Sequence, residues 1–493
     1  MLIDAQKSDF VVPDKVYDAC ICGAGFAGIS IARELAKKGK SVALLEAGGD
    51  EYSDRSQDIY NGKTINGSGL YYWNDVADCR IRYFGGTSAH WAGLCYVPDA
   101  IDFEDGDRWG LPGWPIRKTD LDGYFDRAAE IIDITGQRFE VANADLWDNS
   151  RLRMVGFVRS PPTRLNEKYL KEVTENANID CFVNCNTVDI RLNGNLDHAT
   201  ELVALNYDGK EFRFRGKQIV IACGAIENAR LLLSCNSQVP NGIGNHSDYV
   251  GRCFMEHLDV PLGRFVTSRP DFWDGGNIGF KPSRELMVKS GVLNAVLSFQ
   301  PDSNPETYGR LRVLKRYLRD AACSSESLLE LSRQMVDFDC PGDGVITTMC
   351  EQAPNRESRI TLGQERDSLG QRRVILNWQI NALDRKTIRL LAMESAREMA
   401  RQNIARVQLK KYILDDEIEI EASGHCHQMG TTRMSENPKH GVVDRNSRVH
   451  GITNLYMAGS SVFSTGGGNN PTLEIVLLSL RLADYLIGDV SAT

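Results

Sequence analysis

The sequence lacks the features that mark membrane-spanning or secreted proteins. None of its apolar runs approaches the roughly 18 uninterrupted residues that a membrane-spanning helix needs. Acidic residues stand in the first ten positions, Met1 to Phe10, where a signal peptide has an apolar core. Positive charge is also in the minority, with 57 Lys and Arg against 66 Asp and Glu, so no nucleic-acid surface is expected. We therefore expect a cytoplasmic globular protein.

The cysteines do not form a pattern. Thirteen are scattered singly along the chain, an odd number without the regular spacing of a disulfide framework. Reduced, mostly buried thiols are therefore expected, in keeping with a cytoplasmic protein. The cluster His425-Cys426-His427 has no second ligand pair at a useful spacing, so no metal site is predicted.

A glycine-rich turn near the start of the chain predicts a dinucleotide site. The apolar run 16–22 has the composition of a buried strand, and it is followed by Gly23-Ala24-Gly25-Phe26-Ala27-Gly28 and a helical pattern over 29–38. A second strand, 41–45, ends at Glu46, which could accept from a ribose diol. An acid here favours an adenosine ribose without a 2′-phosphate, as in FAD or NAD. The N-terminal position of the motif, without a second nucleotide fold, favours FAD.

The last helical segment is predicted to begin at a reactive centre. Three glycines precede Asn469 and Asn470, and Pro471 suits the first position of a helix that is apolar over 472–486. A buried helix start carries free N–H groups and partial positive charge, so it should face an anion or a developing anion. Asn470 could alternatively serve only as the helix cap.

The remaining chain predicts a two-part α/β architecture. At 493 residues it exceeds one compact core. Strand-like runs at 181–190, 201–207, 211–215 and 219–225, with a helix to 233, belong with the N-terminal motif. We expect a Rossmann-like FAD-binding domain in three parts (1–100, 161–259 and 421–493), a connector or lid at 101–160, and an α+β substrate domain on an antiparallel sheet at 260–420. A basic amphipathic helix at 308–322 is interpreted as a solvated face over a local core, with a membrane or partner surface as the alternative.

The motifs, taken in order, resemble the glucose–methanol–choline (GMC) oxidoreductases. They are the N-terminal glycine motif, Gly85-Gly86-Thr87-Ser88-Ala89-His90-Trp91, His427-Gln428-Met429-Gly430 and Asn470-Pro471-Thr472-Leu473. The closer likeness is to the bacterial sugar and glycoside dehydrogenases and the pyranose oxidases. The resemblance implies a flavoprotein that oxidises alcohols. Many flavoproteins have Gly-Asp where this chain has Gly459-Ser460, so backbone N–H groups or a hydroxyl would have to replace that carboxylate.

The resemblance also implies roles for particular residues. His427 matches the catalytic base and Asn470 its partner, while His425 and Gln352 are candidates for substrate binding; His425 is also an alternative base, and Gln352 an alternative structural residue. His90 falls where pyranose oxidases attach FAD covalently, although we favour non-covalent FAD. The residues expected to contact the cofactor are Gly23, Gly25, Phe26, Ala27, Gly28, Glu46, Ala47, Arg80, Gly85, Gly86, Thr87, Ser88, His90, Trp91, Ala92, Gly93, Val188, Ala222, Cys223, Gly224, Gly459, Ser460, Asn470, Pro471 and Thr472.

These expectations define one main hypothesis and two alternatives. The main hypothesis is FAD-dependent oxidation of a secondary alcohol of a sugar, glycoside or cyclitol, with dioxygen or another acceptor taking the electrons. The alternatives are a non-redox lyase on the same scaffold and a non-catalytic flavin-binding subunit. A partner subunit or a homo-oligomer is compatible with each of the three.

Overall fold

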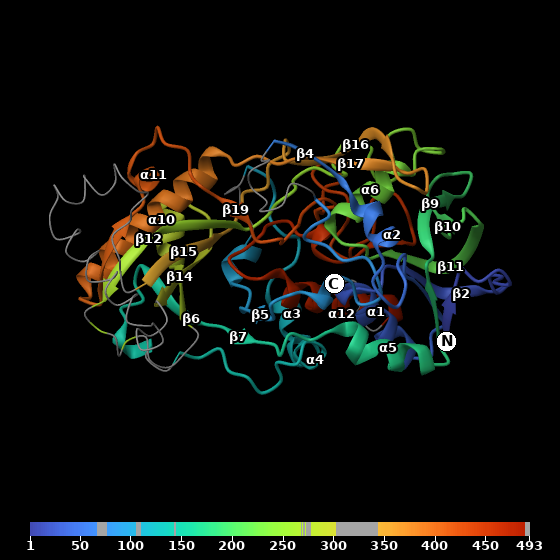
Figure 1. Cartoon of the computed structure of the whole chain (residues 1–493), viewed down its shortest axis with the longest axis horizontal. Helices are drawn as coiled ribbons and strands as arrows, with labels where there is room; N and C mark the ends of the chain where they lie inside the picture. Colours follow the sequence, from blue (N-terminus) through green and yellow to red (C-terminus); the bar gives the residue numbers. More distant parts are fainter. Residues whose placement is uncertain are drawn as a thin grey trace, which may run out of the picture.

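The fold was examined in a computed structural model of the chain. It describes residues 1–66, 76–104, 110–141, 144–267, 269, 272, 278–301 and 344–488. The predicted basic helix at 308–322 lies outside these residues. The molecule is elongated, with one large β-sheet in each half (Figure 1).

The half that contains the N-terminus is built on an eight-stranded mixed sheet. Its central strands are buried along most of their length, which is why they appear in the sequence as continuous apolar runs. The parallel strands are β1 (Leu2–Asp4), β8 (Ile179–Val183), β3 (Val42–Leu45), β2 (Val16–Cys22), β11 (Glu211–Ile221) and β20 (Leu455–Met457). β10 (Ala199–Leu205) and β9 (Asn186–Leu192) continue beyond β11 as an antiparallel meander.

Helices cover this sheet on both sides (Figure 1). α1 (Phe26–Lys37) packs against α12 (Pro471–Ile487), with α4 (Phe125–Ile131) and α5 (Leu165–Glu175) nearby. α6 (Ala225–Ser234) lies on the opposite side, next to the small sheet β16 (Arg359–Arg366), β17 (Arg372–Asn377) and β4 (Gly62–Asn66). Two elements that are more than 430 residues apart in sequence, α1 and α12, thus share one hydrophobic interface.

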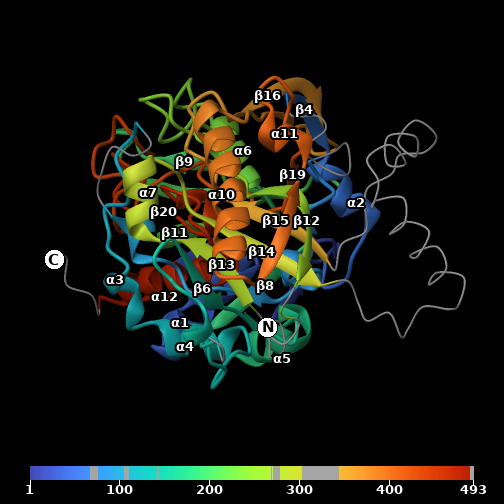
Figure 2. The same ribbon diagram turned by 90° about the vertical axis from the view of Figure 1, so that its left-hand side faces the viewer.

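The other half is built on an antiparallel sheet with one long helix across it. The strand order is β18 (Ala405–Leu409), β12 (Leu258–Thr267), β15 (Gly344–Cys350), β14 (Ala295–Pro301), β13 (Ile278–Pro282) and β6 (Leu152–Gly156), and β19 (Ser423–Gly424) also pairs with β12. α10 (Ala382–Arg401) crosses one face of the sheet (Figure 2). It begins with a capping box between Asn381 and Asp384, whose side chains and backbone N–H groups bond reciprocally.

Short elements complete the described chain. They are the pair β5 (Leu94–Cys95) and β7 (Val158–Arg159), the helices α2 (Asp54–Gln57), α3 (Thr119–Asp122), α7 (Arg284–Ser290) and α11 (Lys411–Leu414), and the 3₁₀ turns η1 (Asp58–Tyr60), η2 (Gly86–Ala89), η3 (Ala100–Phe103), η5 (Ala144–Leu146) and η8 (Ser460–Val462). Of the helices that the structure describes, none combines the length and the apolar character needed to cross a bilayer.

The predicted mixed α/β fold is confirmed, but several boundaries differ. The run 181–190 is two strands, because Asn184 adopts a left-handed conformation between β8 and β9. The runs predicted at 211–215 and 219–225 are one strand, β11, which ends at Ile221. Its first part pairs with β10 and its second part lies between β2 and β20. The stretch 50–66, for which no element was predicted, contains α2, η1 and β4.

Strand pairing bears on the predicted division into domains. β6, from the connector 101–160, pairs with β13 of the antiparallel sheet. β4, from the segment 1–100, pairs with β17 from the segment 260–420. We retain the division as a proposal, with these two strands exchanged between its parts.

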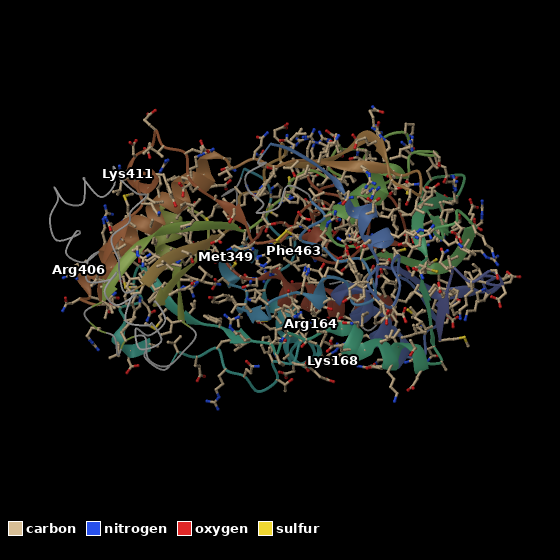
Figure 3. The ribbon with its side chains drawn as sticks, in the orientation of Figure 1. Arg164, Lys168, Met349, Arg406, Lys411 and Phe463 are labelled. Atoms are coloured by element: carbon tan, nitrogen blue, oxygen red, sulfur yellow. A yellow bond between two sulfur atoms is a disulfide. The ribbon has the colours of Figure 1, made fainter. Side chains whose placement is uncertain are left out.

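The expectation of reduced cysteines was wrong for one pair. Cys79 and Cys426 form a disulfide between residues 347 positions apart, visible as the yellow bond near the centre of Figure 3. No spacing pattern could indicate this pair, since only the folded chain brings the two residues together. Of the other cysteines in the described ranges, eight are buried and Cys223 is partly exposed.

Candidate active site

A cavity of about 810 Å³ lies between the two halves of the molecule. A smaller cavity of about 90 Å³ shares Gly23, Glu46, Tyr60 and Cys223 with it, so the two form one elongated space. The larger volume falls in the range of small-molecule and cofactor sites. Most of the predicted cofactor residues line one cavity or the other: Gly23, Gly25, Phe26, Ala27, Glu46, Ala47, Arg80, Gly86, Thr87, His90, Trp91, Ala92, Gly93, Val188, Ala222, Cys223, Gly224, Gly459, Ser460, Asn470, Pro471 and Thr472.

The glycine motif forms one end of this space. A Cβ on Gly23 would lie 2.6 Å from the carbonyl oxygen of Ala222, and one on Gly28 would lie 1.8 Å from the carbonyl oxygen of Gly23. Gly28 therefore does not line the cavity but lets α1 start close to β2. A Cβ on Gly25, which does line the cavity, would meet no protein atom within 4 Å. Gly25 is also the N-cap of α1 and supplies no side-chain hydrogen bond, so the free N–H groups of that helix face space that suits a pyrophosphate.

Glu46 lies where the two cavities meet. Its carboxylate accepts hydrogen bonds from the backbone N–H groups of Ala24, at 2.8 Å, and Gly48, at 2.9 Å. Burial raises the pKa of Glu46, and these backbone donors oppose that rise. The remaining lone pairs of the carboxylate suit the hydroxyl groups of a ribose.

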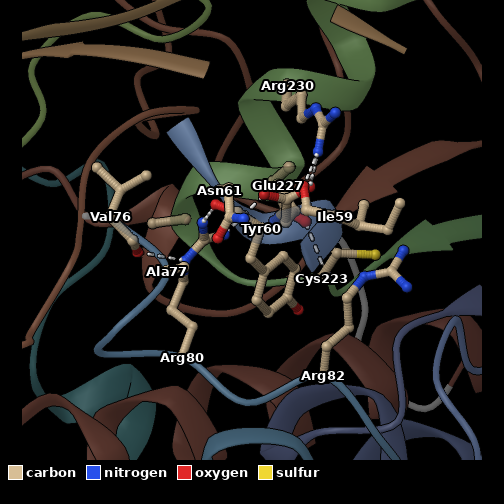
Figure 4. A network of polar contacts seen from close by, with 12 residues as sticks. Ile59, Tyr60, Asn61, Val76, Ala77, Arg80, Arg82, Cys223, Glu227 and Arg230 are labelled. Carbon is tan, nitrogen blue, oxygen red and sulfur yellow. Dashed lines mark hydrogen bonds and ion pairs between the residues drawn. The ribbon is translucent and has the colours of Figure 1, made fainter. Parts of the chain in front are cut away.

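Arg80 borders the cavity but is already engaged by the protein (Figure 4). Its guanidinium is 2.6 Å from the carboxylate of Glu227, donates to the carbonyl of Tyr60 at 2.9 Å and stacks on the Tyr60 ring. Glu227 also pairs with Arg230. A role for Arg80 in shaping the wall agrees better with these contacts than a direct bond to the cofactor.

Arg82 is a polar residue at the nucleotide end that the sequence analysis missed. It is buried, lines the smaller cavity and donates to the hydroxyl of Tyr207 at 2.9 Å. In Figure 4 its guanidinium lies on the other side of the Tyr60 ring from that of Arg80. The only sequence feature that could have indicated this position is that Arg82 follows Arg80 at a spacing of two residues.

The loop 85–93 forms part of the wall as predicted, with two exceptions. Gly85 has a left-handed conformation, and a Cβ there would meet the backbone nitrogen of Asn166 at 2.8 Å. The hydroxyl of Ser88 donates to the carbonyl of Gly85 at 2.7 Å and accepts from the N–H of Leu165. Neither residue lines the cavity, so both shape the loop, whereas His90 faces the cavity with an exposed side chain.

Gly459 and Ser460, in place of the Gly-Asp of many flavoproteins, also line the cavity. Gly459 has a left-handed conformation, and η8 begins directly after it. The hydroxyl of Ser460 donates to the carbonyl of Gln428 at 2.6 Å, so only its lone pairs remain for a ligand.

His427 and Asn470 meet at the other end of the cavity. The Nε2 atom of His427 lies 3.4 Å from Nδ2 of Asn470, and both residues line the cavity. Asn470 precedes α12, but its side chain does not cap the helix, so the carboxamide is not occupied by that role. Burial, followed by the neighbouring His257 and His425, holds the pKa of His427 well below its usual value. The imidazole is therefore neutral at neutral pH.

Strand pairing explains how the histidines come together. β19 pairs with the start of β12, which places Gly424 opposite Leu258, and the N–H of His425 bonds to the carbonyl of His257 at 3.1 Å. The His425 ring stacks on that of His427 with a centroid distance of 5.6 Å. His257, which the sequence analysis missed, is fully buried, and its Nδ1 lies 3.0 Å from Nδ1 of His427.

The prediction that Gln352 binds substrate does not agree with its position. Gln352 is buried and does not line the cavity. Its amide donates to the carbonyl of Gln379 at 2.8 Å and accepts from the N–H of Glu256 and the indole N–H of Trp378. The alternative structural role fits these contacts, because every one of them is to the protein.

Side chains of the antiparallel sheet form the wall that faces His427. They alternate along β14 and β15, as expected for strands with one face toward a cavity. The sequence predicted an antiparallel sheet in this part of the chain but not which side chains face the cavity. The lining residues of this sheet are Val296, Ser298, Gln300, Thr347 and Met349.

A buried carboxyl lies just behind the start of α12. Glu474 is 4% exposed, and its carboxylate accepts from the amide of Asn469 at 3.1 Å. Burial raises the pKa of Glu474 to about 8, and the nearby acids Asp102 and Glu351 add to the rise. This carboxyl is thus protonated at neutral pH and adds no negative charge beside Asn470.

The described ranges contain no group of three or more His, Cys, Asp or Glu side chains arranged to hold a metal ion. The pairs formed by Cys79 with Cys426 and by His257 with His427 account for the cluster around residues 425–427.

Comparison with known families and proteins agrees with this geometry. Residues 354–479 match the GMC oxidoreductase family, in its C-terminal region, and residues 18–117 match the family of FAD-dependent oxidoreductases. The chain is 24% identical to the fructose dehydrogenase large subunit of Gluconobacter japonicus, over 96% of this chain and 98% of that protein. It is 23% identical to paromamine 6'-oxidase of Streptomyces fradiae, over 97% of this chain and 92% of that protein.

Solved structures share the fold. Pyridoxine 4-oxidase from Mesorbium loti superposes with a TM-score of 0.62 at 16% identity, covering 96% of this chain and 100% of that chain. A fungal aryl-alcohol oxidase also superposes with a TM-score of 0.62 at 16% identity, covering 96% of this chain and 99% of that chain. One assignment agrees with both matched families, with the full-length relatives and with a cavity that has the glycine motif at one end. The chain is an FAD-dependent enzyme that oxidises alcohols, and it is similar to the GMC oxidoreductases over nearly its whole length.

Proposed function

We propose that the protein oxidises a secondary alcohol of a sugar, glycoside or cyclitol to the ketone, with His427 as the base. The observation that carries this proposal is the pairing of a neutral imidazole with an uncommitted carboxamide at the wall of the cavity. Bound FAD supplies the acceptor for the hydride that leaves the carbon atom. His427 takes the hydroxyl proton at Nε2, and the carboxamide of Asn470 holds the hydroxyl and orients the C–H bond.

The protonation state of His427 supports its role as the base. A general base must be unprotonated at the working pH, and an imidazole whose pKa lies below its usual value meets this condition. The start of α12 adds partial positive charge beside the pair, since Asn470, Pro471 and Thr472 all line the cavity. That charge favours the alkoxide that develops as the hydroxyl proton leaves the alcohol.

The preference for a polyhydroxylated substrate rests on two observations. Ser298, Gln300 and Thr347 present hydrogen-bonding groups from the opposite wall. Two full-length relatives are named for action on fructose and on paromamine, which are a sugar and an aminoglycoside. A partner subunit that accepts the electrons is part of this proposal, because one of these relatives is named as a large subunit.

An anaerobic substrate screen tests the proposal. Sugars, glycosides and cyclitols are mixed with the holoenzyme, and the loss of visible flavin absorbance is recorded. We expect rapid bleaching with at least one of them, whereas turnover without bleaching would indicate lyase chemistry and contradict the proposal. Release of FAD on denaturation is expected too, and flavin that stays on the precipitated chain would instead indicate a bond to His90.

Two matched variants test which histidine is the base. His427→Ala should slow flavin reduction by at least about a hundredfold with FAD still bound. His425→Ala removes a neighbour that also lines the cavity but whose Nε2 lies 3.7 Å from the carboxylate of Asp259, so it should slow reduction much less. Parental rates in the His427 variant, with a large loss in the His425 variant, would transfer the role to His425.

A further inference from the structure

Four groups form a continuous hydrogen-bonded chain that ends at the cavity. The carbonyl oxygen of Gly467 lies 2.8 Å from Nε2 of His257, and Nδ1 of His257 lies 3.0 Å from Nδ1 of His427. Nε2 of His427 then lies 3.4 Å from Asn470. The two imidazole rings are nearly perpendicular, at 85°, so each nitrogen of His257 is directed at one partner.

The positions of the protons in this series of hydrogen bonds can be assigned by starting from the Gly467 carbonyl, at its buried end. A carbonyl oxygen only accepts, so Nε2 of His257 must carry the proton that it shares with Gly467. Burial lowers the pKa of His257 to about 4, so its ring is neutral and Nδ1 is an acceptor. Nδ1 of His427 must therefore be the donor between the two rings. Because His427 is neutral as well, its Nε2 carries a lone pair, and this atom is the one beside Asn470.

We propose that His257 is a positioning residue that fixes His427 in the tautomer whose Nε2 lone pair faces the substrate. The proposal rests on the proposed function, because it assigns a reason for the basicity of the atom that takes the hydroxyl proton. His257 does not contact substrate itself, since it is fully buried and does not line the cavity. It acts only through His427.

The backbone around the two rings supports a fixed arrangement. One carboxylate oxygen of Glu256 accepts from the backbone N–H groups of both His257 and His427. The same carboxylate oxygen thus fixes the backbone of both histidines, which keeps the two rings in hydrogen-bonding distance of each other. Met255 and Met429 also pair across the same two segments.

The same series of hydrogen bonds determines where the proton taken from the substrate hydroxyl can go. When Nε2 of His427 accepts the hydroxyl proton, the ring becomes positively charged and its Nδ1–H bond to His257 strengthens, as charge-assisted bonds do. His257 cannot pass a proton onward, because its far nitrogen already donates to the Gly467 carbonyl. The proton therefore leaves from Nε2, on the cavity side.

Two amide substitutions separate the two contacts of His257. In His257→Asn the amide oxygen can stand near the position of Nδ1, which keeps an acceptor for His427. In His257→Gln the amide N–H can stand near the position of Nε2, which keeps the donor to Gly467. We expect anaerobic flavin reduction to slow by roughly 10- to 100-fold in the Gln variant, and by much less in the Asn variant. The matched control His450→Gln makes the same change at a histidine whose Nε2 lies 2.9 Å from the carbonyl of Ser435, away from the cavity, and this variant should reduce at the parental rate.

A second readout does not depend on activity. With ¹⁵N-labelled histidine, long-range ¹⁵N–¹H correlations distinguish the two neutral tautomers, and the eight histidines allow His427 to be identified by its loss in a variant. We expect His427 of the parental holoenzyme to carry its proton on Nδ1. A proton on Nε2 would overturn the proposal even if both amide variants failed to fold. Faster reduction in the Gln variant than in the Asn variant would also overturn it, since His257 would then only hold the Gly467 loop.

Discussion

A negative charge at position 470 should move the pH dependence of flavin reduction. In the parental protein Nδ2 of Asn470 lies 3.4 Å from Nε2 of His427. The substitution Asn470→Asp would place a carboxylate there, and the start of α12 would keep it ionised. Two unit charges about 4 Å apart interact by about 4 kcal/mol at an effective dielectric constant of about 20.

The sign of the effect follows from the role of His427. The base must be neutral, and its pKa in the parental protein lies below the usual value, so the parental rate should hold into mildly acidic pH. A neighbouring carboxylate stabilises the protonated ring and raises that pKa. Since about 1.4 kcal/mol is a tenfold change in equilibrium, the acid limb should move up by about 2 to 3 pH units.

Stopped-flow anaerobic reduction from pH 5 to pH 9 measures this shift. Asn470→Ala is the matched control, because it removes the carboxamide without adding charge and should slow reduction without moving the acid limb upward. Identical acid limbs in the two variants would refute the reasoning, since they would mean that the group that titrates is not beside residue 470.

Three further predictions concern the cofactor cradle, the buried acid and the disulfide. Gly25→Val should weaken FAD binding at least tenfold by fluorescence titration, because its side chain would enter open cavity space; unchanged affinity would place the pyrophosphate elsewhere. Glu474 has a pKa of about 8 in the folded protein, so its protonation stabilises the fold below pH 4.5 and that contribution is lost as pH rises to about 8. Glu474→Gln should therefore have a higher melting temperature than the parent at pH 9 and a similar one at pH 5. Cys426→Ser should lower the free energy of unfolding by about 2 to 4 kcal/mol, and a reductant should destabilise the parent but not the variant.

The sequence predicted the parts of the site that depend on local geometry. The turn at Gly23 and Gly28, the strand that ends at Glu46 and the helix that begins at Pro471 each follow from residues adjacent in the chain. These are also the places where backbone conformation limits the choice of residue. The confirmed α/β fold and the FAD cofactor rest on the same signals.

The parts that the sequence did not predict depend on distant pairing. His257 comes within 3.0 Å of His427 only because β19 pairs with β12, and nothing in its own neighbourhood distinguishes it from a core histidine. Gln352 stands near recognisable residues, yet the indole of Trp378 and two backbone groups occupy its amide. A motif indicates proximity to a site, but the partners of a polar side chain decide whether it is available to a ligand.

The shared interface of α1 and α12 has a consequence for biosynthesis. The helix that starts at Phe26 leaves the ribosome early, while the helix that covers it ends only at Ile487. Until that late segment has been translated, the early one exposes apolar surface and the flavin compartment lacks a wall. The compartment for the cofactor is therefore complete only after α12 has been synthesised and has packed against α1.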